Sequence, residues 1–211
     1  MMRLTQGRIL ALKTLLHLGF ILPLAYLWLS VQSGAAGGDP VQYVIHFLGM
    51  GALHGLMLSL LVSPLAKGLQ MGGLMRVRRL IGLWAFVYAL LHVAAFLGLD
   101  LLGDVALLLG EIVKRPYILV GMATLLILSA MAATSPGAMQ RRLGRRWQQL
   151  HDWVYLAAVL APVHFWWSVK SGWYEPALYL SLCLGLLAWR RKRIVFYQQI
   201  VTSFNRGLNR G

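Results

Sequence analysis

Charged side chains are scarce in this chain. They make up 12% of its 211 residues, about half the share found in soluble globular proteins. Hydrophobic residues account for 59%. A water-soluble globular protein is therefore excluded, and the composition predicts an all-α integral membrane protein in which helices satisfy their own backbone hydrogen bonds.

Cysteine is almost absent, since Cys183 is the single one. It forms no internal disulfide and indicates no zinc or iron–sulfur site. We interpret it as a small buried hydrophobic residue. The length of the chain leaves no room for a nucleotide-binding domain, which needs on the order of 100 further residues.

Long apolar segments fill most of the sequence and form a single transmembrane domain over residues 1–211. Six of them have spanning or near-spanning length. They cover residues 14–31, 41–62, 79–98, 116–134, 149–168 and 174–189. The first segment has some features of a secretory signal peptide, but we favour an uncleaved helix. No internal repeat is apparent along the chain.

Acidic residues are also few, and their distribution predicts the orientation. Seventeen of the 20 Lys and Arg residues fall on one side of the predicted spans, whereas five of the six acids fall on the other. By the positive-inside rule the basic side and both termini are cytoplasmic. We therefore expect a multi-pass membrane protein whose basic side faces the cytoplasm. Its positive charge favours anionic lipid or an acidic cytoplasmic partner over nucleic acid.

An apolar stretch with three acids, residues 99–113, lies between the third and fourth predicted spans. Its leucines favour a short helix lying on the outer surface over a plain loop.

Histidines inside the apolar segments are the candidate functional residues, because ionisable side chains in lipid are costly. His92, on the third span, lies about 20 Å from the cytoplasmic side. His164, on the fifth span, has a matching depth. Two neutral imidazoles facing each other across a bundle suit a bis-histidine haem. The alternative for each histidine is a polar residue hydrogen-bonded across helices.

His151 precedes His164 by thirteen residues, which is roughly 20 Å along a helix. The same spacing rotates the two side chains by roughly 220°, so an ideal helix does not place them on one face. Pro162 lies between them and could bend or unwind the helix. Alternatively, the two histidines do not serve the same row of cofactors.

The remaining histidines suggest less. His17 lies in the inner half of the first span, and His46 lies near the outer end of the second, at a depth from which it could approach a haem edge. For His54 we favour pairing with a neighbouring side chain. Three glycines cluster on the second span and leave room for a flat macrocycle or, more commonly, for close helix packing. They are Gly49, Gly51 and Gly55.

Several stretches carry a resemblance to a known family. They are RRLIGLWAFVYALLH (78–92), RPYILVG (115–121) and AMQRRLGRRWQQLHDWVYLAAVLAPVHFWWSVK (138–170), with support from 16–28 and 39–47. In these stretches the chain resembles the ferric reductase-like transmembrane superfamily. Within it, the chain is most similar to the MsrQ (formerly YedZ) family, the haem-binding membrane subunits of bacterial periplasmic methionine sulfoxide reductase systems.

The resemblance implies a multi-pass haem b protein of the bacterial inner (cytoplasmic) membrane. It would pass electrons outward to MsrP, a periplasmic molybdopterin enzyme that repairs oxidised proteins. It also implies FMN as a cofactor, and a cytosolic flavin reductase or quinone as the electron donor. The superfamily's iron ligands correspond to His92, His151 and His164. The chain itself would perform no substrate chemistry and would act as the electron-transfer subunit of an oxidoreductase system.

One departure from the superfamily concerns the inner site. Many members carry a second histidine on the third span, where this chain has Arg78 or Arg79. His151 would then need another partner, such as His17. Alternatively the inner site holds a flavin whose phosphate contacts Arg76, Arg78 and Arg79. We expect one outer haem and an inner flavin.

Two other classes of protein remain as alternatives. A quinol-oxidising cytochrome b with another acceptor predicts a quinone-sized pocket near the haem. A transporter or metal carrier that uses its histidines for ions predicts a colourless protein.

Overall fold

The computed structural model describes residues 5–169 and 172–189, and within them it is helical, with no strand. Helices cover all six predicted segments. In chain order the long helices are α1 (Gln6–Gln32), α2 (Pro40–Gly68), α3 (Met75–Ala95), α5 (Tyr117–Ala133), α8 (Val154–Ser168) and α9 (Tyr174–Trp189). Shorter ones are the 3-10 turn η1 (Gly72–Leu74), the π-helical turn η2 (Phe96–Asp100), α4 (Val105–Lys114), α6 (Gly137–Leu143) and α7 (Arg145–Asp152).

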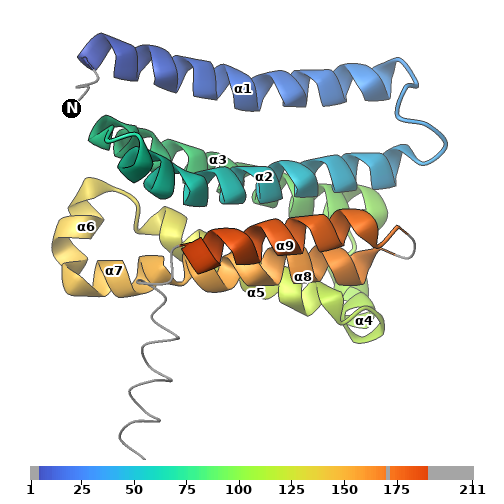
Figure 1. Cartoon of the computed structure of the whole chain (residues 1–211). Helices are drawn as coiled ribbons and strands as arrows, with labels where there is room; N and C mark the ends of the chain where they lie inside the picture. Colours follow the sequence, from blue (N-terminus) through green and yellow to red (C-terminus); the bar gives the residue numbers. More distant parts are fainter. Residues whose placement is uncertain (1–4, 170–171, 190–211) are drawn as a thin grey trace, which may run out of the picture.

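The long helices lie side by side along one direction (Figure 1). The α2–α3 turn and the short helices α6 and α7 lie at one end of the bundle, and α4 lies at the opposite end. The first end carries the basic loops. The second carries the short helix expected over residues 99–113, which the structure places at Val105–Lys114.

Polar caps and proline explain where the helices at the α4 end begin. The Asp39 carboxylate accepts a hydrogen bond from the Gln42 backbone N–H at 3.0 Å, and Pro40 supplies the first helical residue of α2. The Asp104 carboxylate accepts a hydrogen bond from the Ala106 backbone N–H at 2.8 Å at the start of α4. These side chains satisfy backbone donors that a helix leaves unpaired.

The fifth predicted segment differs from expectation. It is not one helix over residues 149–168, because α7 ends at Asp152 and α8 begins at Val154. Nor is Pro162 the point of interruption, since it lies inside the continuous helix α8. Proline is tolerated there because neighbouring helices and local adjustments compensate for its missing N–H in membrane bundles.

Among the described residues, three helical stretches are long and apolar enough to cross a membrane. They are Gln6–Gln32, Pro40–Gly68 and Gly72–Asp100. A fourth results if the bent pair α4 and α5 counts as one span. The helices α8 and α9 have 15 and 16 residues, fewer than the roughly 20 of a typical span. Several basic residues behind the predicted orientation, among them Arg3 and those at 190–193, lie outside the described residues.

Two helical hairpins form the centre of the bundle. α2 packs against α3, and α5 packs against α8. Small residues allow the close approach of these helices, since Ala85, Ala157 and Ala158 are fully buried. A Cβ atom on Gly55 would lie 3.0 Å from the Cβ of Ala85, so a larger side chain would crowd the contact between α2 and α3.

Candidate functional site

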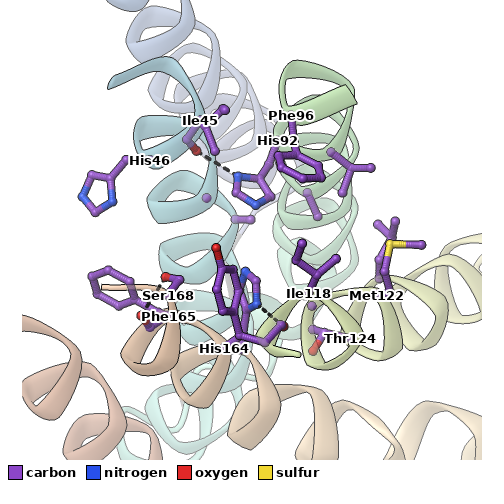
Figure 2. A pocket seen from close by; sticks show the side chains of 18 of the residues that line it. Ile45, His46, His92, Phe96, Ile118, Met122, Thr124, His164, Phe165 and Ser168 are labelled. Atoms are coloured by element: carbon purple, nitrogen blue, oxygen red, sulfur yellow. Dashed lines mark hydrogen bonds between the residues drawn. The ribbon is translucent and has the colours of Figure 1, made fainter. Parts of the chain in front are cut away.

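A cavity of about 330 Å³ lies between the two hairpins. Most of its walls are apolar side chains of α2, α3, α5 and α8. Figure 2 shows His92 from α3 and His164 from α8 on opposite sides of this cavity. The two histidines that the sequence placed at equal depth therefore do meet in space.

The spacing of the two rings suits a shared metal ion. The ring centres of His92 and His164 lie 6.2 Å apart, and the ring planes are inclined by 85°. A metal–nitrogen bond of about 2.0–2.1 Å on each side, with about 1.1 Å from nitrogen to ring centre, predicts roughly 6.3 Å for two imidazoles on one metal ion. The observed separation matches this value.

Each imidazole is oriented by one backbone carbonyl. His92 Nδ1 lies 2.8 Å from the carbonyl oxygen of Ile45, and His164 Nδ1 lies 2.8 Å from that of Tyr117. A carbonyl only accepts, so Nδ1 carries the proton in both rings. The lone pair of each imidazole is then on Nε2. This is the usual arrangement for a histidine that binds a metal.

Glycine makes room for both rings. A Cβ atom at Gly49 would lie 3.1 Å from His92 Nδ1, and one at Gly121 would lie 2.8 Å from His164 Cε1. The sequence singled out Gly49 for packing or for a macrocycle. It did not single out Gly121, although the Gly-Met pairs at 49–50 and 121–122 were a possible signal.

The two histidines alone do not complete a metal site. Among the described residues, no three His, Cys, Asp or Glu side chains converge where they could hold an ion. Two opposed axial ligands in an apolar cavity instead fit a metal whose other donors come from a flat macrocycle such as a porphyrin. The residues present thus fit a haem.

A second hollow, a groove of about 530 Å³, adjoins the cavity and shares His46 and Met50 with it. On its wall His54 Nε2 lies 2.7 Å from the Tyr179 hydroxyl oxygen. This pairing agrees with the structural role favoured for His54 from the sequence. His46 itself lies beside the Phe165 ring, 5.6 Å between centres (Figure 2).

His151 lies away from the cavity, on α7. Its Nε2 is 3.1 Å from the Thr134 hydroxyl oxygen, and its ring stacks on Trp147 with 4.0 Å between centres. α7 precedes the apolar helix α8 and lies outside the spanning segments. Burial, followed by the positive charge of Arg78, lowers the pKa of His151 from 6.5 to about 4. His151 is therefore neutral at physiological pH.

His17 has a different partner on a different helix. Its Nδ1 accepts a hydrogen bond from Trp84 Nε1 at 3.0 Å, which places the proton of the neutral ring on Nε2. Neither His17 nor His151 lines the cavity. In the described part of the chain His17 pairs with Trp84 and His151 with Thr134, rather than the two histidines pairing with each other as inner ligands. Arg76, Arg78 and Arg79 lie within the first five residues of α3, at the basic end.

The charged residues that border the cavity near α4, opposite the basic end of the bundle, were not identified from the sequence. Arg115 lines the cavity, and its Nε lies 2.9 Å from the Glu111 carboxylate. Its guanidinium also lies 3.8 Å from Asp100, another lining residue. A cation with two acidic partners thus borders the apolar cavity on the side of α4.

Comparison with known proteins gives a consistent picture. Residues 48–162 match the family model described as "Ferric reductase like transmembrane component". A Klebsiella pneumoniae protein named "Protein-methionine-sulfoxide reductase heme-binding subunit MsrQ" is 49% identical over 91% of this chain and 96% of its own length. Relatives of the same name from Enterobacter sp. and Salmonella enteritidis are each 46% identical, over 91% of this chain and 97% of theirs. No solved structure matches the chain.

Proposed function

The chain belongs to the ferric reductase-like transmembrane family and, within it, to the MsrQ haem-binding subunits, and we propose that it carries electrons across the bacterial inner membrane to MsrP. The acceptor would be this periplasmic subunit, which reduces methionine sulfoxide in oxidised proteins. In this role the chain tunes distance and potential and performs no substrate chemistry.

The facing pair His92 and His164 carries the proposal. These imidazoles would hold one haem b through Nε2, while the carbonyl oxygens of Ile45 and Tyr117 fix both rings. The haem supplies a one-electron couple when bound. The apolar walls exclude water from the site and so influence its potential.

The electrons would enter at the basic end. We propose an inner FMN whose phosphate is bound by Arg76, Arg78 and Arg79 at the start of α3, fed by a cytosolic flavin reductase. His151 would lie beside this entry point rather than on iron, because its Nε2 is engaged by Thr134. MsrP would dock at the opposite end, near α4.

This direction of transfer requires a matching topology. We propose six spans formed by α1, α2, α3, α5, α8 and α9, with both termini in the cytoplasm. The excess of Lys and Arg at the α2–α3 and α6–α7 connections supports that orientation. The asymmetry of charge would also attract anionic lipid to the inner face.

A quinol donor is the second candidate, and one observation favours it. The groove beside the haem cavity has room for a lipid-soluble ring and carries the His54–Tyr179 pair, with Glu175 on the same wall. These groups could accept the protons that a quinol releases on oxidation. In this reading, quinol alone would reduce the haem.

Spectroscopy of purified protein tests the main proposal. His92→Ala and His164→Ala should each abolish the low-spin haem spectrum, whereas the control His17→Ala should leave it unchanged. A pyridine haemochrome assay with flavin quantification should give one haem and one FMN per chain. Two haems without flavin would contradict the inner flavin, and an unchanged spectrum in both histidine variants would remove the ligand assignment.

A further inference from the structure

The surroundings of the two cavity histidines are spaced identically along the chain. His92 is hydrogen-bonded to the carbonyl of Ile45, 47 residues before it. His164 is hydrogen-bonded to the carbonyl of Tyr117, also 47 residues before it. Each ring also packs on a glycine 43 residues before it, Gly49 for the first and Gly121 for the second. We call each histidine with its carbonyl and its glycine a half-site. Adding 72 to the residue numbers of the first half-site gives those of the second.

The same shift reveals an internal repeat, so the expectation that the chain carries none is wrong. Residues 45–92 and 117–164 align without a gap, and 12 of the 48 positions are identical. The identical pairs include Gly49 and Gly121, Met50 and Met122, Ser63 and Ser135, Pro64 and Pro136, Ala85 and Ala157, and His92 and His164. The repeat unit is one helical hairpin.

The residues around the cavity follow the same shift of 72 residues. Of the 28 residues that line the cavity, 24 form 12 pairs separated by 72 residues. Leu56 and Leu128 form such a pair, as do Ala85 and Ala157, and all four belong to one buried cluster. Equivalent residues meet in this way when two copies of a unit face each other across a pseudo-two-fold axis. That axis passes through the cavity.

The cavity is thus built from two copies of one hairpin, and we infer that Gly49 and Gly121 are positioning residues that hold the two imidazole planes nearly perpendicular. The inference rests on the proposed binding of haem by His92 and His164. The carbonyl bond sets the rotation of each ring, and the missing Cβ atom allows the ring to lie there. Each half-site fixes the orientation of its own ring, and the two orientations together give the observed 85° between the ring planes.

The orientation has an electronic consequence that can be measured. Perpendicular imidazole planes leave two iron d orbitals close in energy, whereas parallel planes separate them. The oxidised wild-type protein should therefore give a highly anisotropic low-spin electron paramagnetic resonance signal with one dominant large g value. A three-line rhombic spectrum, typical of parallel planes, would overturn the inference even though haem is bound. Absence of haem would instead defeat the proposed function.

Glycine variants then test the cause. Gly121→Ala places a methyl group 2.8 Å from His164 Cε1, and Gly49→Ala places one 3.1 Å from His92 Nδ1, so both should lower the largest g value, the first more strongly. Gly82→Ala on α3 is the matched control, because its Cβ would meet nothing within 4 Å. Variants with the control's spectrum and midpoint potential would overturn the inference. If Gly121→Ala does not fold, the test rests on the spectrum of the milder Gly49→Ala variant and on that of the wild-type protein.

Discussion

Replacing Gly51 by alanine is expected to destabilise the protein by about 2–4 kcal/mol. A Cβ atom at Gly51 would overlap Cδ1 and Cε1 of the Tyr88 ring, so the ring must shift by more than about 1 Å to restore normal contact. Tyr88 is only 2% exposed, and its hydroxyl donates a hydrogen bond to the Phe20 carbonyl at 2.6 Å. Overpacking costs about 1–3 kcal/mol, and an interhelical hydrogen bond in a membrane about 0.6 kcal/mol.

Thermal unfolding in mild detergent, followed by circular dichroism, measures this effect. A loss of about 2–4 kcal/mol corresponds to a drop in melting temperature of roughly 4–16 °C for a chain of this size. The control Gly82→Ala adds a methyl group where there is open space and should change the melting temperature little or raise it, because alanine favours helix.

The second hairpin supplies a compensating change. The positions equivalent to Gly51 and Tyr88 hold Ala123 and Leu160. The double variant Gly51→Ala/Tyr88→Leu copies that pair into the first hairpin. It should lose less stability than the two single variants together, with a coupling of about 0.5–3 kcal/mol. A Gly51→Ala protein as stable as the control, or strictly additive variants, would refute the overlap argument.

Three further predictions concern other parts of the molecule. Asp39→Ala should cost about 1 kcal/mol by removing the N-cap of α2, and unchanged thermal unfolding would show that the cap contributes nothing. Stability should fall as the pH falls from about 6.5 towards 4, because the unfolded chain protonates His151 before the folded chain does. His151→Gln should flatten that part of the profile, and an unaltered slope would assign it to other groups. Arg115→Ala should change stability by less than about 1 kcal/mol, because its ion pairs are partly exposed, and a larger loss by thermal unfolding would contradict this.

The helices and the facing histidines could be predicted from the sequence. Apolar runs of spanning length form helices because a bilayer leaves the backbone no other partner. The positive-inside rule then converted sequence position into depth, and equal depth on parallel helices predicted that His92 and His164 face each other. Their ring centres lie 6.2 Å apart. Resemblance to the ferric reductase-like superfamily led to the same residues.

Other features required coordinates. The break at Trp153 has no proline or glycine of its own, so it could not be distinguished from a continuous helix. The orienting carbonyls of Ile45 and Tyr117 carry no side-chain signal. Sequence patterns alone do not single out the repeat, because its identities are scattered and are mostly small or apolar residues that recur in any membrane helix. Contacts, rather than composition, revealed the shift of 72 residues.

The repeat also explains why the two ends of the bundle differ in chemistry. Near the cavity the two hairpins keep the same glycine, methionine and histidine. Towards the basic end the two hairpins differ in length, since α2 continues to Gly68 whereas α5 stops at Ala133. They also differ in chemistry, because the shift of 72 residues pairs Arg79 with His151. A symmetric inner pair of ligands would need histidine at both positions. The arginine at one of these positions instead favours an anionic group over a second iron. We therefore propose a single haem per chain, with a flavin beside the arginines.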